Sequence, residues 1–280
     1  MEFAGQRTRS RLGALFEAPL VPCICFILFL LAAYWARSLP NAEASLWTVL
    51  LSAALSSIAG FAFSPLAGAV LFQVNTDAVL VVQILLVASI AQQIYCIWHL
   101  RVHVRSLEFL PYIAGSLITL PFGILLLLKT QASSFLPMLG LFLMAYGAFA
   151  AFRPAIELSK SNPLFGRLLA GALGGITGGL AAFPGAFVAI WCQAQGFDKD
   201  RQRSIVQPFI LINQVVAVAI LSFVRPMATV SLETIQYAAP AILGAFVGLC
   251  IFRRLRTSEF NRIVGAALAF AGLLMALKGL

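Results

Sequence analysis

Apolar residues run along this chain in long stretches that short polar segments separate. Most stretches are near 20 residues, the length that an α-helix needs to cross about 30 Å of hydrocarbon. The pattern predicts an all-α polytopic membrane protein in which residues 1–280 form a single transmembrane domain. The stretches lie at about 20–36, 46–72, 78–99, 109–128, 134–152, 165–192, 205–224, 234–252 and 261–277.

Two of these stretches carry glycine and proline inside an otherwise apolar sequence. They are Ser56–Phe72, which contains Pro65, and Gly171–Trp191, which contains Pro184. In a helix interior glycine costs about 1 kcal/mol and proline about 3 kcal/mol. Both stretches are therefore expected to hold a broken helix.

Composition supports the membrane class, since 61% of the residues are hydrophobic and 10% are charged. The net charge of +9 is spread over loops between apolar stretches, which indicates topology rather than nucleic-acid binding. The five cysteines lack metal-ligand spacing. No loop places a nucleophile beside a base, so we expect no enzyme, no metal and no cofactor.

The N-terminus carries Arg7, Arg9 and Arg11 ahead of the run from Leu20 to Ala36. This run could be a signal peptide, because Ala42-Glu43-Ala44 resembles a cleavage site. Its length favours a first transmembrane helix at 20–36. The prediction is a multi-pass protein of the bacterial plasma (inner) membrane with a cytoplasmic N-terminus.

The remaining segments form two copies of one unit. Ser106-Leu107-Glu108 recurs as Ser231-Leu232-Glu233, and further identities follow at the same offset of 125. Repeat 1 spans 46–152 and repeat 2 spans 165–278. The further pairs are Tyr112/Tyr237, Ala114/Ala239, Gly123/Gly248, Gly140/Gly265 and Gly147/Gly272, while Pro65 matches Pro184 at an offset of 119.

The basic residues indicate how the two repeats are oriented. If the first segment of each repeat enters and leaves on one side, 15 of the 19 basic residues are cytoplasmic; if it crosses fully, 12 are. The prediction is an N-terminal helix plus two inverted repeats, each a re-entrant broken helical hairpin followed by three transmembrane helices. Long kinked spans are the alternative.

The breaks suggest a site for an anion. The second half-helix of each hairpin is expected to begin at Pro65, with Ser64 as its N-cap, or at Pro184. The free N–H groups of the two half-helices then point at one another, and such helix ends attract anions. Gly178 and Gly179 lie just before the second break. All ten acidic residues fall at segment ends or in loops, and no lysine or arginine falls inside a span, so neutral donors are expected to bind the anion.

Neutral donors follow each hairpin at matching positions. Gln83, Ser89, Gln92 and Gln93 follow the first, and Gln207, Asn213 and Gln214 follow the second. These side chains either line the site or join helices to one another.

The second hairpin and the segment after it resemble the TauE/SafE-like sulfite exporter (TSUP) family of membrane permeases. The resemblance rests on GALGGITGGLAAFPG at 171–185, on Gly196-Phe197-Asp198-Lys199-Asp200-x-x-Arg203, and on Phe209 and Asn213 in the next helix. It implies a permease for sulfite or an organosulfonate that an ion gradient drives. The matching positions are Gly174, Gly175, Gly178, Gly179, Pro184, Arg203 and Asn213, whereas Phe61, Phe63, Ser64 and Ala181-Ala182-Phe183 depart from the pattern.

Together the residues and the resemblance predict a secondary transporter, an exporter, of a small anion such as sulfite or another organosulfur anion near the bilayer midplane. The alternative is a non-transporting membrane scaffold or assembly factor, in which the glycines only permit close helix packing. The bilayer and the small anion are the expected partners. A proton as coupling ion and a homodimer stay open.

Overall fold

The computed structural model describes residues 42–75, 77–100, 107–152, 163–197, 199–224, 232–252 and 257–277. All regular structure in these ranges is helical. The predicted first helix at 20–36 lies outside them. The elements are α3 (Ala42–Ala59), α4 (Phe63–Val74), α5 (Ala78–Leu100), the 3-10 turn η1 (Leu107–Phe109), α6 (Leu110–Lys129), α7 (Ala132–Phe152), α8 (Pro163–Ala181), α9 (Gly185–Ala194), α10 (Lys199–Val224), α11 (Leu232–Ile235), α12 (Ala238–Phe252) and α13 (Thr257–Leu277).

The predicted apolar segments coincide with these helices. The two glycine- and proline-bearing segments each fold as two helices, α3 with α4 and α8 with α9, and the members of each pair contact one another. We call residues 60–62 the first break and residues 182–184 the second break. The segment predicted at 234–252 is α12, which a turn at 236–237 separates from the short α11.

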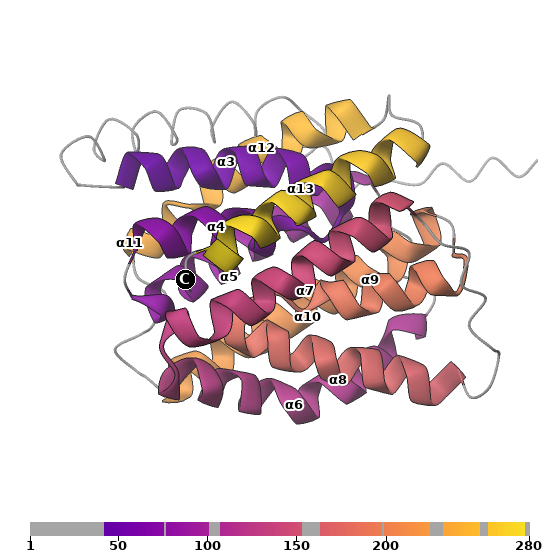
Figure 1. Ribbon diagram of the computed structural model, residues 1–280, viewed down its shortest axis with the longest axis horizontal. Coiled ribbons are helices and arrows are strands. Elements are labelled where there is room, and N and C mark those ends of the chain that lie inside the picture. Colours follow the sequence, from indigo (N-terminus) through magenta and orange to yellow (C-terminus); the bar gives the residue numbers. More distant parts are fainter. Residues whose placement is uncertain are drawn as a thin grey trace, which may run out of the picture.

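The two helix pairs open toward opposite ends of the bundle. In Figure 1, α3 begins and α4 ends at the left, while α8 begins and α9 ends at the right. Each pair therefore reverses direction at its break.

Five helices in the described ranges are long and apolar enough to cross a membrane by length and composition: Ala78–His99, Leu107–Lys129, Leu164–Ala181, Asp200–Val224 and Glu233–Ile251. Large apolar side chains point outward on several of them, among them Ile118, Phe122 and Phe165. An outward apolar surface is what a lipid environment requires. This is a multi-pass membrane protein.

The helices of residues 42–152 pack mainly on those of residues 163–277. α3 packs on α12, α8 packs on α6, and α7 packs on α13. Glycine permits the close approach: a Cβ atom on Gly171 would lie 2.0 Å from the carbonyl oxygen of Tyr112, and one on Gly248 would lie 2.1 Å from that of Ala54. Small residues serve this purpose in many membrane helix pairs.

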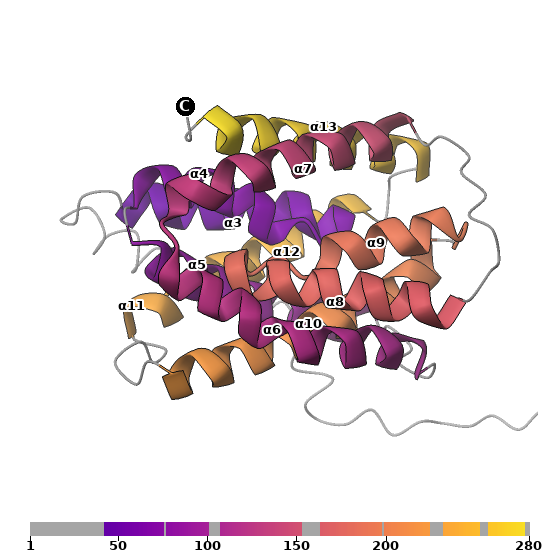
Figure 2. The same cartoon turned by 60° about the horizontal axis from the view of Figure 1, so that its bottom comes forward.

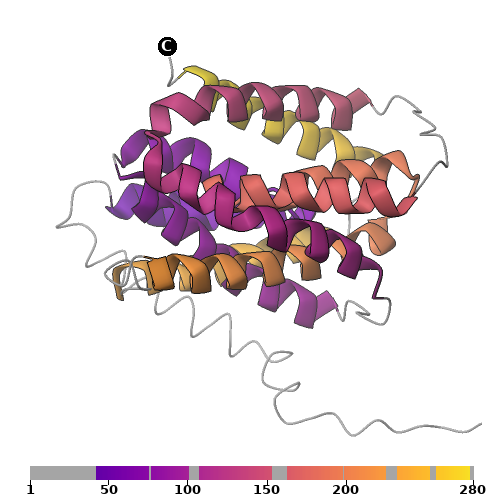
Figure 3. The ribbon, with the colours of Figure 1, turned by 90° about the horizontal axis from the view of Figure 1, so that it is seen from below.

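α7 and α13 lie side by side along one edge of the bundle (Figure 2 and Figure 3). They cross at four glycines that the sequence repeat had singled out. A Cβ atom on Gly140 would lie 2.5 Å from the carbonyl oxygen of Gly272, and one on Gly147 would lie 2.6 Å from that of Gly265. Gly140 thus faces Gly272 rather than its repeat equivalent Gly265, and Gly147 faces Gly265 rather than its repeat equivalent Gly272.

Candidate anion-binding site

Each break begins with a residue of positive φ. Gly60 has a φ of +85° and Ala182 has a φ of +54°. Each is followed by a buried phenylalanine and then by the N-cap residue of the next helix, Ala62 or Pro184. The breaks therefore correspond at an offset of 122 (Gly60 to Ala182), and the matching of Pro65 with Pro184 at 119 is wrong.

The second half-helices begin without a side-chain cap. Neither Ala62 nor Pro184 makes a side-chain capping hydrogen bond. The prediction that Ser64 caps α4 is wrong, because α4 begins at Phe63 and Ser64 lies inside its first turn. Pro65 also lies in that turn, where a missing N–H costs little. Two buried helix N-termini thus keep N–H groups that no side-chain cap satisfies.

The two breaks touch at the centre of the protein. A Cβ atom on Gly185, the first residue of α9, would lie 3.2 Å from the Cβ atom of Phe61. Phe61, Phe63 and Phe183 are all buried. Three buried aromatic residues thus lie at or next to the breaks.

Arg203 brings a buried positive charge to the first break, and the expectation of neutral donors only is wrong. Its side chain is 5% exposed. Its Nη2 donates to the carbonyl oxygen of Ser57 at 2.9 Å and to that of Ile58. A Cβ atom on Gly60 would lie 3.4 Å from its Nε. Arg203 lies in α10, within one of the candidate spans.

Amide side chains of α5 hold the first break from the other side. Gln92 Nε2 donates to the hydroxyls of Ser56 at 2.6 Å and Ser57 at 3.0 Å, and Gln93 Nε2 donates to the carbonyl oxygen of Gly60 at 3.4 Å. Both glutamines are among the neutral donors that the sequence predicts after the first hairpin. They lie three and four residues beyond Ser89, about one helical turn away.

The second break is held by its own helix. Thr177 Oγ1 donates to the carbonyl oxygen of Phe183 at 2.7 Å, and the Phe183 backbone N–H donates to that of Thr177 at 3.1 Å. No residue of α5 or α10 is needed for these two bonds.

Several predicted residues meet around the breaks. Asn213 donates to the Ser116 hydroxyl and faces Gly178, whose Cβ atom would lie 2.5 Å from the Asn213 Oδ1. Gln214 Nε2 donates to the Ser89 hydroxyl at 2.8 Å, which links α10 to α5. A serine hydroxyl can donate a hydrogen bond or accept one. The amides of Asn213 and Gln214 can therefore turn either their oxygen or their nitrogen toward a ligand and keep a hydrogen bond to the serine.

The other predicted residues are placed differently. Gln207 is fully buried beside Gly60, and neither its Nε2 nor its Oε1 has a hydrogen-bond partner among the described residues. Gln83 is only partly buried. Gly179 faces away from the breaks, because a Cβ atom there would lie 2.6 Å from the backbone of α6 at Leu120 and Ile124.

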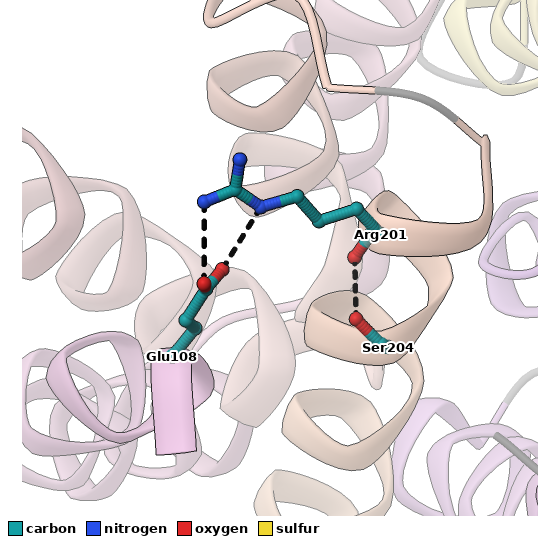
Figure 4. A network of polar contacts seen from close by, with 3 residues as sticks. All are labelled: Glu108, Arg201 and Ser204. Carbon is teal, nitrogen blue, oxygen red and sulfur yellow. Dashed lines mark hydrogen bonds and ion pairs between the residues drawn. The ribbon is translucent and has the colours of Figure 1, made fainter. Parts of the chain in front are cut away.

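An ion pair lies at the end of the bundle where α6 and α10 begin. Arg201 donates from Nε to the Glu108 Oε2 at 3.1 Å and from Nη2 to the Oε1 at 3.2 Å (Figure 4). The same guanidinium lies 3.8 Å above the ring of Phe197. The pair joins the first repeat to the second between η1 and α10.

These groups can bind an anion and release it. Two helix N-termini and one arginine provide positive potential, and buried amides provide hydrogen bonds. In the described ranges no three His, Cys, Asp or Glu residues are arranged to hold a metal ion. The chemistry of these groups favours a small anion as ligand, and the helices that carry them belong to a multi-pass membrane protein.

The family comparison leads to the same class. The model of the sulfite exporter TauE/SafE family matches residues 44–275, so the chain belongs to this family of membrane transporters. Neither the search of curated proteins nor the search of solved structures found a match.

Proposed function

We propose that this protein is a secondary transporter that exports a small sulfur oxyanion, such as sulfite or an organosulfonate, across the bacterial inner membrane. Membership of the sulfite exporter family is the basis for proposing transport and for the kind of substrate. The buried positive potential at the breaks agrees with a negative substrate.

The proposal includes two inverted repeats, each opening with a re-entrant hairpin. It is supported by hairpins that open at opposite ends of the bundle. It is also supported by helix packing between the two halves of the chain, of α3 on α12 and of α8 on α6. Inverted repeats with broken helices are a common transporter plan, and their substrate binds where the breaks meet.

One observation carries the proposal: two uncapped helix N-termini meet beside a buried arginine. A buried helix end without a cap needs a partner, and an anion satisfies both its N–H groups and its dipole. Ser64, Gly178, Gln207, Asn213 and Gln214 are the nearby groups that we assign to the anion.

The side chain of Phe61 at the first break has to move if an anion is to bind there. Phe61 packs against Tyr146 with ring centroids 5.9 Å apart, and it also touches the start of α9. An anion that binds between Phe61 and the start of α9 would have to displace the Phe61 side chain. Phe61 is thus the residue we expect to move when substrate enters.

The glycines of α8 are the one feature that agrees equally well with the alternative of a non-transporting scaffold. Gly171, Gly175 and Gly179 are accounted for by close packing on α6. Packing does not require two buried, uncapped helix ends beside a cation. We therefore prefer transport, and Gly179→Leu tests helix packing rather than substrate binding.

Radiolabelled sulfite flux into proteoliposomes tests the proposal. We expect saturable flux, faster with an imposed pH gradient if a proton is the coupling ion. Gln207→Ala should raise the KM for sulfite, whereas Gln236→Ala, in the turn before α12 and away from the breaks, should behave as the wild type. Flux equal to that of empty liposomes for sulfite and for a panel of sulfonates would rule out the proposal.

A further inference from the structure

A second cluster of buried polar side chains lies along α9, away from the breaks. Its members come from three helices: Tyr112 from α6, Tyr146 from α7, and Cys192 and Gln193 from α9. The Cys192 thiol makes a weak hydrogen-bonding contact with the Tyr112 hydroxyl and interacts electrostatically with Tyr146, while Gln193 makes a weak hydrogen-bonding contact with the Tyr146 hydroxyl. Tyr112 and Cys192 are 0% exposed and Tyr146 is 2% exposed.

The polar atoms of this cluster are not satisfied within the described part of the protein. The hydroxyls of Tyr112 and Tyr146 and the Gln193 Oε1 are buried and make no well-formed hydrogen bond there. Buried polar groups nearly always have a partner, because leaving one unpaired costs free energy.

Packing does not explain the hydroxyls. The Tyr112 ring makes an edge contact with Phe209 at a centroid distance of 6.4 Å, and the Tyr146 ring contacts Phe61. A phenylalanine would make both contacts equally well. The two O–H groups therefore need another reason to be present.

The cluster lies between the central site and the basic end of the bundle. Cys192 is seven residues beyond Gly185, which places it about 10 Å along α9 from the second break. On its other side, Arg167, Arg201 and the ion-paired Glu108 lie close enough to act electrostatically on Cys192, so two positive charges and one negative charge face it there. An anion that entered from the basic end would pass the cluster before it reached the breaks.

The equivalent place in the other repeat is not built this way. At the offset of 125, Tyr237 corresponds to Tyr112, and its hydroxyl bonds the side chain of Ser45. Ala271 corresponds to Tyr146, and Val70 corresponds to Cys192 at the offset of 122 that the breaks define. Only one of the two entrances thus has this unpaired polar lining.

We propose that Tyr112, Tyr146, Cys192 and Gln193 form a second subsite, a waiting position for a small oxyanion on its way to the breaks. The two hydroxyls, the thiol and the amide N–H donate hydrogen bonds to the anion. The subsite rests on the proposed function, because it serves the same substrate.

Sulfite flux in proteoliposomes tests the subsite with Tyr112→Phe, Tyr146→Phe and the double variant, and Tyr237→Phe is the matched control. We expect each single change to raise the KM for sulfite about tenfold, since a hydrogen bond to a charged group has about that effect or more. Tyr237→Phe should leave the KM unchanged.

Thermal unfolding of the same variants separates binding from packing. Removing an unpaired buried hydroxyl should leave the midpoint unchanged or raise it, whereas Tyr237→Phe loses a hydrogen bond and should lower it. If the wild type carries sulfite and the double variant has the same KM, or if Tyr237→Phe raises the KM equally, the subsite is ruled out. If the wild type carries no anion, the proposed function fails and the subsite fails with it.

A second measurement does not depend on sulfite. With Cys192 as the single cysteine, we expect iodoacetate to react faster relative to neutral iodoacetamide than it does in the same protein with Tyr112→Phe and Tyr146→Phe. An equal ratio in both proteins would contradict an anion subsite.

Discussion

The two breaks have the same backbone plan but are held in different ways. The first break uses glycine at the positive φ and is fixed by side chains of other helices: Arg203 from α10 and Gln93 from α5. The second uses Ala182 and is fixed by Thr177 of its own hairpin. One break depends on its neighbours, and the other is self-contained.

This difference suggests which half of the site moves. A shift of α10 relative to α3 would pull Arg203 away from the carbonyl oxygens of Ser57 and Ile58, whereas the second break would keep its shape. We therefore expect the first break to respond to substrate and the second to act as the fixed side. The variants below test this contrast.

The largest effect is expected at Arg203. Arg203→Met removes the donor of two carbonyl oxygens and the positive charge beside the breaks. Since a hydrogen bond from a charged group contributes about 1.5 to 3 kcal/mol, sulfite flux should fall about 100-fold. Flux per reconstituted protein is the measurement. Arg203→Lys keeps the charge and should recover part of it; equal loss in both variants would mean that charge is unimportant.

Thr177→Val should weaken the second break with a smaller effect. The change removes the hydroxyl that donates to the Phe183 carbonyl but keeps the branched shape. Stability should fall by about 1 kcal/mol, measured by thermal unfolding in detergent, with the KM for sulfite little changed. A KM effect as large as that of Arg203→Met would contradict a fixed second break.

The positive-φ positions should respond with opposite signs. Gly60→Ala places a side chain at a φ of +85° and should destabilise the protein by about 1 kcal/mol. Ala182→Gly relieves the same restriction and should stabilise it by up to about 1 kcal/mol. Unfolding midpoints that shift in the same direction would show that the two breaks do not share this backbone plan.

The smallest effect is expected at the ion pair between Glu108 and Arg201. Both side chains are partly exposed, and such pairs contribute about 0.2 to 1 kcal/mol. A double-mutant cycle with Glu108→Gln and Arg201→Gln measures the coupling, which should shrink at high salt. A coupling above about 2 kcal/mol would mean that the pair does more than join the repeats at the surface.

The sequence was sufficient to predict the helices and the breaks. Apolar runs near 20 residues determine the helices, because length and hydropathy alone select them. Glycine and proline inside two of the runs located the breaks to within a few residues. The four glycines at the crossing of α7 and α13 were among the residues that the offset of 125 singled out, but the offset did not predict which of them face each other.

The site was less predictable because it depends on which side chains tertiary packing brings together. The two breaks were aligned with each other by their prolines. The residues that correspond in the structure are instead Gly60 and Ala182, which both have a positive φ. Arg203 was assigned to a loop with the other basic residues. Its spacing of four from Gln207 was the available signal, since that spacing places the two side chains on one helix face.

The exchanged packing of the helices has a consequence for how the protein is made. α3 packs on the glycines of α12, yet α12 begins only at Ala238, long after α3 ends at Ala59. At about 5 to 20 residues per second, translation separates the two by roughly 10 to 40 seconds. During biogenesis the first hairpin must therefore persist in the bilayer or in the insertion machinery without its partner. Neither half of the chain can complete its core alone.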